Sequence, residues 1–225
     1  AELADIDPAE LPLPVVLKPA VGFCSMGVYT IASPDDWEAA LADIDREEQV
    51  WAQRYPGSVV DTGRFVVEGY IAGQEYAIDM YYDAQGRAQC LNVMRHDFAS
   101  ADDTSDRLYN TSHEIVAEMA PRFERWLDEV NDVLGARDFP AHVEVRVDDA
   151  GDIVPVEFNP LRFAGLGGTD LAYWAWGLRT YEAFLEDAEV DVAALSAPHA
   201  GKVYTMSLLN PHPGADLSRP FLYDA

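Results

Sequence analysis

The sequence has little cysteine and almost no lysine. Its 225 residues include two cysteines, Cys24 and Cys90, which lie far apart and outside any metal-type spacing. This pattern argues against a disulfide framework and a cysteine-based metal site, and we expect a reducing, cytoplasmic compartment. Lysine occurs only at Lys18 and Lys202.

Positive charge and long apolar runs are also scarce. Fifteen basic residues stand against forty acidic ones, for a formal charge of −25. Such a field repels nucleic-acid backbones and anionic lipid, so we expect neither as a partner. No apolar stretch approaches the ~20 residues of a membrane span, and no signal-peptide pattern is present. The acids are spread along the chain, as in a halophile-type solvated surface or an ordinary acidic enzyme.

Apolar residues are plentiful enough for a core. Hydrophobic residues make up 49% and aromatic residues 11% of the chain, well above the composition of disordered chains. The length suits one two-lobed unit or one domain with an appendage. The elements below combine short strands and hairpins with long helices.

Periodicity and turn residues predict these elements directly. A helix begins at Pro34, with Ser33 as its N-cap, and runs to about Trp51; a second follows the capping box at 111–114 and ends at Gly135. An aromatic-rich helix is predicted over Asp170–Ala188, although its aromatic residues also fit a substrate pocket. Strands are predicted at Val15–Leu17, Val28–Ile31, Phe65–Val67, Gln74–Tyr82, Arg87–Arg95, Ala141–Asp148, Ile153–Asn159 and Lys202–Leu209, with an irregular segment at Pro211–Pro220.

The hairpin at 141–159 gathers oxygen ligands on one face. If a four-residue loop, 149–152, connects its strands, Glu144 lies opposite Glu157 and His142 lies opposite Asn159. Opposed like charges destabilise a sheet unless a cation lies between them, and two carboxylates with an amide suit Mg²⁺. A solvated acidic sheet face is the alternative. The other face is predicted to pack in the core, through Val143, Val145, Val154, Val156 and Phe158.

Two further segments suggest nucleotide contacts. Lys18 follows an apolar strand and precedes a loop with glycines at 22 and 27, an arrangement that can place an ammonium and backbone N–H groups against phosphates. The loop lacks the P-loop pattern, so a surface lysine beside an ordinary turn is the alternative. Around Glu68 a strand ends with free backbone groups that could hold adenine, and Glu75 could accept from ribose hydroxyls. Surface acids at a bend would look the same.

Taken in their order along the chain, the Lys18, Glu68–Glu75 and 141–159 segments resemble the ATP-grasp family of carboxylate-amine ligases, in particular its amino-acid and dipeptide ligase branch. The match runs through 16–19, 68–76, 142–146 and 156–160, and the thirteen-residue spacing of Glu144 and Glu157 is similar to that of the family's two metal-binding acids. The resemblance covers about Val15 to Gly168.

The resemblance implies a role for each matching residue. Lys18 would contact the α- and β-phosphates, and Glu75 the ribose. His142 and Arg162 would be catalytic residues facing the acyl phosphate or the acceptor, although Arg162 lies three residues after Asn159 where the relatives have two. The β- and γ-phosphates would be covered by Ser25, Met26 and Gly27; adenine would be held by Glu68, Gly69, Tyr70 and Ile71; and Mg²⁺ or Mn²⁺ by Glu144, Glu157 and Asn159.

The implied fold is α+β, with a small lid lobe, residues 1–64, and a larger lobe, residues 65–225, each with an antiparallel sheet and helices, and the nucleotide between them. The implied activity is an ATP- and Mg²⁺-dependent ligase that joins a small carboxylate to an amine through an acyl phosphate. The family usually has an upstream lysine and a preceding domain, so a catalytically degenerate nucleotide-binding module is one alternative, and an ATP-grasp phosphotransferase is another. The sequence leaves open whether the chain forms a homodimer.

Overall fold

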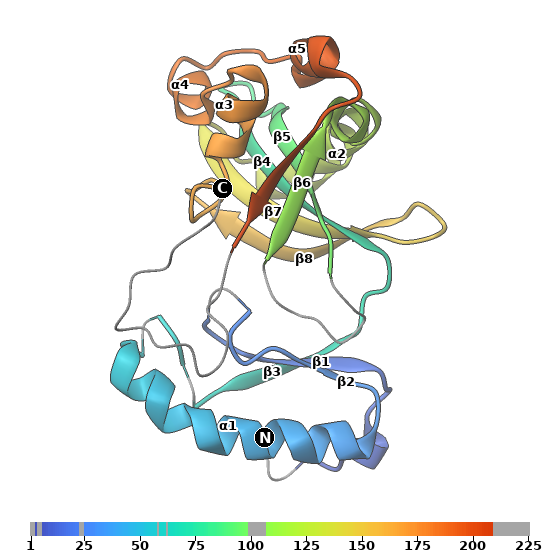
Figure 1. Ribbon diagram of the computed structural model, residues 1–225, viewed down its shortest axis with the longest axis vertical. Helices are drawn as coiled ribbons and strands as arrows, with labels where there is room; N and C mark the ends of the chain where they lie inside the picture. The colour runs from blue at the N-terminus through green and yellow to red at the C-terminus, as the bar shows by residue number, and fades with distance from the viewer. Residues whose placement is uncertain are drawn as a thin grey trace, which may run out of the picture.

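The computed structural model describes residues 3, 6–22, 25–57, 59–61, 63–98 and 107–208. Cys24, Leu209 and Pro211–Pro220 lie outside them, as do their predicted features. Figure 1 shows two lobes, each built on its own sheet. The predicted α+β class with two antiparallel sheets is confirmed.

The small lobe is one three-stranded sheet covered by one long helix. Strands β1 (Val15–Pro19), β2 (Tyr29–Ile31) and β3 (Phe65–Gly69) pair antiparallel in the order β2-β1-β3. Helix α1 (Pro34–Arg54) begins at the predicted N-cap, since Ser33 accepts from the Asp36 backbone N–H. A short 3₁₀ turn, η2 (Pro8–Glu10), precedes β1. The buried core of the lobe is Val15, Leu17, Ile31, Trp37, Ala40 and Ile44.

The large lobe is a six-stranded antiparallel sheet in the order β8-β7-β4-β5-β6-β9. Its strands are β4 (Gln74–Tyr82), β5 (Ala88–His96), β6 (Leu108–Ser112), β7 (Phe139–Val147), β8 (Ile153–Pro160) and β9 (Val203–Ser207). Helix α2 (His113–Leu134) covers one face and contributes fully buried Phe123 and Leu127. It ends as predicted, because Gly135 adopts a left-handed φ of 65°, but its N-cap is Ser112, which accepts from the Ile115 N–H, one residue after the Thr111 that begins the predicted capping box.

The other face of this sheet is covered only in part. Helices α3 (Asp170–Trp176) and α4 (Thr180–Leu185), labelled in Figure 1, contribute Leu171 and Ala183 to clusters on this face. Helix α5 (Val192–Ser196), which is followed by the 3₁₀ turn η3 (Ala197–His199), instead packs beside α2 and adds Val192 to the same core. The prediction of one helix over Asp170–Ala188 was wrong, because Gly177 ends α3 with a φ of 79°. Trp176 packs in the core, whereas Trp174 is 74% exposed.

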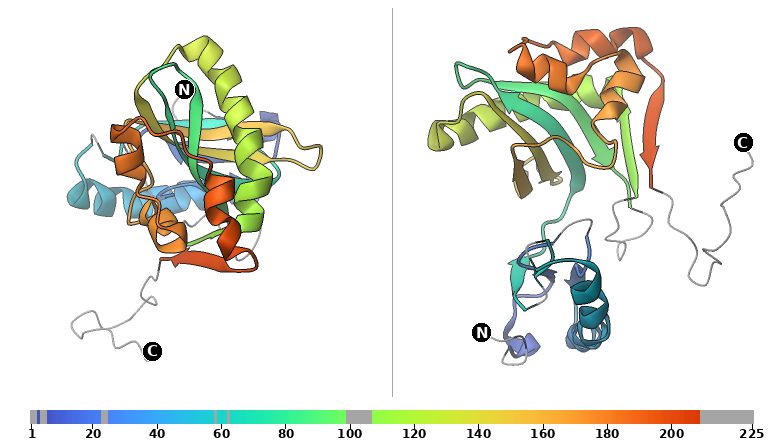
Figure 2. Two further views of the ribbon diagram at one scale, coloured as in Figure 1. Left: turned by 90° about the horizontal axis from the view of Figure 1, so that it is seen from above. Right: turned by 90° about the vertical axis from the view of Figure 1, so that its left-hand side faces the viewer.

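Residues 70–73 join the two sheets, and Figure 2 shows the lobes on either side of this connection. The sheets therefore change between Gly69 and Gln74, one strand after the boundary expected between residues 64 and 65. Gly73 is required here: its φ is 123°, and a Cβ would lie 2.3 Å from the Val147 carbonyl oxygen. Only glycine allows so close an approach. None of the described helices is long and apolar enough to span a membrane.

Candidate active site

The face of the large sheet opposite α2 carries the charged residues that the sequence singled out. Alternation directs Ile78 and Val143 to the α2 core, so Ala77, Asp79, Glu144 and Arg146 share the opposite face. Strand pairing arranges this face in three rows across β5, β4, β7 and β8. The rows are Asn92–Asp79–His142–Asn159, Met94–Ala77–Glu144–Glu157 and His96–Glu75–Arg146–Val154.

The central row confirms the predicted pairing of the two carboxylates. Glu144 lies opposite Glu157, and His142 lies opposite Asn159. The pairing arises differently from the prediction, because Val147 pairs with Ile153 around a five-residue turn, 148–152, and a register shift beyond Val145 restores the expected partners. A bulge of this kind adds one residue to one strand.

The bulge corrects the predicted core face. Val143 and Val145 are fully buried, and Phe158 packs against the same core. Val154, however, lies opposite Arg146 and so shares the face of Glu144, and the pairing passes over Val156. The expectation that Val154 and Val156 pack with these core residues was therefore wrong, because strict alternation ignores an inserted residue.

The pKa of the Glu157 carboxyl is raised. Partial removal from water, and then the negative charge of Glu144, raise the pKa of Glu157, while the nearby Asn159 side chain and then the charges of Arg162 and Lys18 act in the opposite direction. The Asn159 side-chain nitrogen is buried and has no hydrogen-bond partner among the described residues. The described chain holds no group of three His, Cys, Asp or Glu side chains arranged for a metal. The predicted set, two carboxylates and an amide, therefore remains a prediction.

His142 is held inside the protein by two carboxylates. Its Nδ1 lies 2.8 Å from Asp79 Oδ1 and its Nε2 lies 3.3 Å from Glu144 Oε1. Burial alone would lower the pKa of His142, but the hydrogen bonds to Asp79 and Glu144 outweigh it and raise the pKa to about 9. The side chain is 7% exposed, and both ring nitrogens contact carboxylates of the protein. The predicted contact of His142 with the acyl phosphate or the acceptor remains a prediction.

Lys18 lies on the small lobe and contributes to the field at Glu157. Its ammonium lies 2.6 Å from a Glu68 carboxylate oxygen, in a pair whose side chains are 28% and 46% exposed. In the adjacent loop, Ser25 and Gly27 have φ values of 53° and 71°. A Cβ on Gly27 would lie 3.0 Å from both Pro19 and Trp51, so the predicted phosphate loop packs tightly on the small lobe.

Glu75 and the connecting segment are tied together by an arginine. Both Glu75 oxygens are engaged, at 2.8 Å from His96 Nδ1 and 2.9 Å from Arg146 Nε, and Arg146 Nη1 donates to the Ile71 carbonyl at 2.6 Å. Burial alone would raise the pKa of Glu75, but His96 and then Arg146 outweigh it and lower the pKa. The predicted adenine and ribose contacts thus start from groups that already have partners.

Arg162 lies on the loop that follows β8. Its Nη1 donates to the Phe163 carbonyl at 3.1 Å, and its charge lowers the pKa of Glu157. The loop is attached to strand β4, because the Ala164 N–H donates to Asp79 Oδ1 at 2.8 Å. Two hollows, of about 360 and 420 Å³, lie elsewhere, beside the β7–β8 and β4–β5 turns.

A family comparison identifies the domain. The family described as an ATP-grasp domain matches residues 11–170, which is most of the chain and contains every residue placed in the three rows. The chain belongs to the ATP-grasp family. No curated protein sequence matches it significantly.

Solved structures show the same fold. An L-amino acid ligase from Bacillus licheniformis superposes with a TM-score of 0.58 at 21% identity, covering 83% of this chain and 41% of that one. A biotin carboxylase–β,γ-ATP complex from Campylobacter jejuni gives 0.56 at 17% identity, covering 80% and 38%. Rhizobium etli pyruvate carboxylase gives 0.58 at 16%, covering 87% and 17%. This ATP-grasp chain therefore spans less than half the length of each of these structures.

Sequence reasoning missed three residues that the structure brings into the candidate site: Asp79, His96 and Arg146. Asp79 interrupts the apolar run of β4 on the same parity as Glu75, a signal that was visible in the sequence. Arg146 stands in line with His142 and Glu144 on β7, so the same alternation could have placed it. His96 is brought to Glu75 only by the β4–β5 register.

Proposed function

We propose that this chain binds ATP with Mg²⁺ or Mn²⁺ between its lobes and transfers the γ-phosphoryl group to a carboxylate, forming an acyl phosphate that an amine then attacks. The observation that carries the proposal is the Glu144–Glu157 pair, opposed across the β7–β8 hairpin within the field of Lys18. Membership of the ATP-grasp family supports it.

The residues present suit a hard divalent cation. Glu144 and Glu157 offer oxygen donors on one face. Burial and then the charge of Glu144 raise the pKa of Glu157, and a cation between the two carboxylates would offset both effects. Asn159 would add an amide oxygen from the same strand. Once bound, the cation would neutralise charge on the transferred phosphoryl group.

Lys18 would supply a second positive charge, toward the phosphates. Its present partner is Glu68, and exposed ion pairs are worth only about 0–1 kcal/mol. Moving the ammonium from Glu68 to a phosphate therefore costs little. The 25–27 loop on the same lobe would cover the phosphates and exclude water.

The connecting segment would hold the base. Glu68 and the backbone from Gly69 to Ile71 lie where the small sheet ends, and the Tyr70 ring is stacked beside the Arg146 guanidinium at 5.3 Å. Because Arg146 already donates to the Ile71 carbonyl, adenine would have to use the other backbone groups or displace that contact. Arg146 would in either case fix the segment relative to β7.

The chemistry balances as two displacements. A substrate carboxylate oxygen attacks the γ-phosphorus, and the bond to ADP breaks. An amine nitrogen then attacks the acyl carbon, phosphate leaves, and the amine loses a proton. The protein contributes mainly by positioning and by neutralising charge. Both substrates are proposed to be small molecules, and the screen below is designed to identify the carboxylate and the amine.

A substrate screen tests the proposal. Purified protein with ATP and Mg²⁺ is offered amino acids and other small acids, with and without an amine, and ADP and phosphate are measured. We expect phosphate release that requires both the acid and the amine. Transfer to a hydroxyl compound without amine would indicate a phosphotransferase. ATP binding without turnover on any pair would indicate a nucleotide-binding module, and either result would overturn the ligase proposal.

A further inference from the structure

Asp79 is a fully buried carboxylate on the face of the sheet that carries Glu144. It is 0% exposed, and its Oδ1 accepts from His142 Nδ1 and from the Ala164 N–H, both at 2.8 Å. Its Oδ2 is buried without a hydrogen-bond partner among the described residues. A buried carboxylate with an unpartnered oxygen costs stability. The fold alone therefore gives little reason for an aspartate at this position.

The contacts of Asp79 lead directly to the predicted metal ligands. His142 Nε2 lies 3.3 Å from Glu144 Oε1, so the ring bridges Asp79 and Glu144. Because Asp79 fixes the other ring nitrogen, the ring cannot turn away from Glu144. The ring faces Oε1 of Glu144, which leaves the other carboxylate oxygen for a cation.

We propose that Asp79 is a positioning residue for the metal site: through His142 it fixes the orientation of Glu144, and through the Ala164 N–H it holds the loop that carries Arg162 beside the same site. This inference rests on the proposed function, since it assigns Asp79 to the cation that Glu144 and Glu157 would bind. Hydrogen-bonded partners that orient metal ligands typically contribute 10- to 100-fold to metal affinity.

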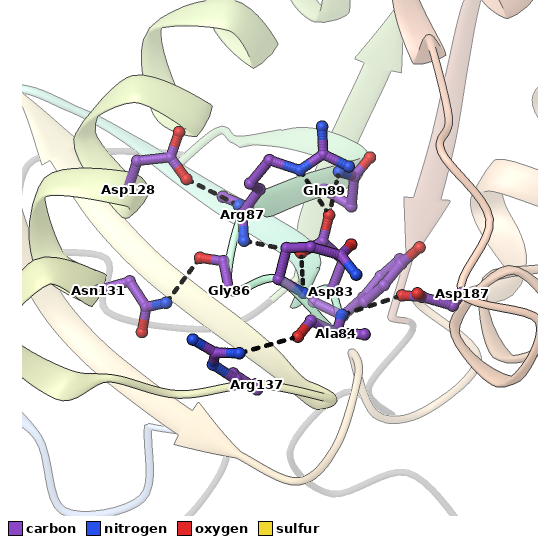
Figure 3. Close-up of polar contacts among 12 residues, drawn as sticks. Asp83, Ala84, Gly86, Arg87, Gln89, Asp128, Asn131, Arg137 and Asp187 are labelled. Atoms are coloured by element: carbon purple, nitrogen blue, oxygen red, sulfur yellow. Dashed lines mark hydrogen bonds and ion pairs between the residues drawn. The ribbon is translucent and has the colours of Figure 1, made fainter.

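A purely structural role is the competing explanation, and the chain offers a matched control for it. Asp83, four residues further along, is also buried, at 3% exposed, and its carboxylate accepts from the backbone N–H groups of Gln85 and Arg87 and from the Arg87 guanidinium. Figure 3 shows that these contacts belong to the β4–β5 turn. The same turn donates N–H groups to Asp187 and to Asp128 of α2, and its Gly86 carbonyl accepts from Asn131. None of them involves Glu144 or Glu157.

The test compares Asp79→Asn with Asp83→Asn. Binding of Mn²⁺ in the presence of ATP is measured from the loss of the free-ion electron paramagnetic resonance signal, and folding is checked by circular dichroism melts. We expect both variants to lose stability but only Asp79→Asn to bind Mn²⁺ about 10- to 100-fold more weakly. If Asp79 acts through His142, adding His142→Gln to Asp79→Asn should weaken Mn²⁺ binding no further.

The outcomes separate this inference from the proposed function. Mn²⁺ affinity of Asp79→Asn within twofold of the wild type, or an equal loss in Asp83→Asn, would overturn the positioning role alone. Additive losses in the double variant would do the same. No ATP-dependent Mn²⁺ binding by the wild type would overturn both claims. If Asp79→Asn does not fold, NMR of the wild type provides the test. The hydrogen-bonded Nδ1 proton of His142 is assigned by its absence from the spectrum of His142→Gln. Its signal must shift when Mg²⁺ and ATP are added, and an unchanged signal refutes the positioning role.

Discussion

Alkaline pH should destabilise the large lobe through His142. The pKa of its ring is raised to about 9, because hydrogen bonds to Asp79 and Glu144 outweigh burial, whereas an unfolded histidine titrates near 6.5. The folded state therefore binds more protons than the unfolded state between these values, and the free energy of unfolding falls as pH rises. The contribution is fully present below pH ~6.5 and is lost as pH rises through about 9.

The expected size follows from the shift. At about 1.4 kcal/mol per unit, the stabilisation is roughly 3 kcal/mol. For a protein of this size each kcal/mol moves the melting temperature by about 2–4 °C, so the fall from pH 6.5 to 9.5 is about 6–12 °C. Two buried tyrosines, Tyr81 and Tyr82, have pKa values raised to about 12 and stay neutral in this range.

The assay is a series of thermal melts of the wild type and His142→Gln in metal-free buffer between pH 6.5 and 9.5. Groups that titrate in both proteins cancel in the difference. The wild type should lose stability toward pH 9.5 more steeply than the variant, by roughly 3 kcal/mol over the range. Parallel curves would refute the assignment of a charged His142 held between Asp79 and Glu144.

Three further substitutions test the core, the connection and the carboxylate pair. Phe123→Ala removes a fully buried ring from α2 and should cost about 3–5 kcal/mol in urea unfolding; less than 1 kcal/mol would contradict the assigned core. Gly73→Ala should lower the melting temperature clearly more than the control Gly69→Ala, whose Cβ would meet nothing within 4 Å; equal effects would show that the close approach to β7 is not real. Glu157→Gln should leave metal-free stability equal or slightly higher, since it removes like-charge repulsion, yet abolish ATP-dependent Mn²⁺ binding; a marked loss of stability would be the contrary result.

The sequence predicted the elements with local signals and missed those decided by tertiary contacts. The start of α1 and the end of α2 followed from Ser33 and Gly135, because caps act within a few residues of their own chain, whereas α2 is capped by Ser112, one residue after the start of the predicted capping box. The 170–188 segment was misjudged because its aromatic residues continue a helical pattern across Gly177, where the chain turns instead.

Strand alternation predicted the part of the candidate site that lies on the β7–β8 hairpin. Alternation placed Glu144 and Glu157 opposite each other even though the turn was one residue longer than expected and a bulge compensated for it. Parity could not show that Glu75 would be taken by His96 and Arg146, because that contact depends on the register of three strands at once. The side-chain partners of His142 were hidden for the same reason.

The central claim, nucleotide bound between the lobes, is tested most directly by calorimetric titration of ATP with Mg²⁺ into the wild type, Lys18→Ala and Lys202→Ala. Lys202 is exposed next to β9 and is the only other lysine in the sequence, so its variant controls for the loss of a positive charge. The account predicts Mg²⁺-dependent binding that Lys18→Ala weakens at least tenfold and Lys202→Ala leaves unchanged. Absence of binding heat in the wild type, or equal effects of the two lysine substitutions, would contradict it.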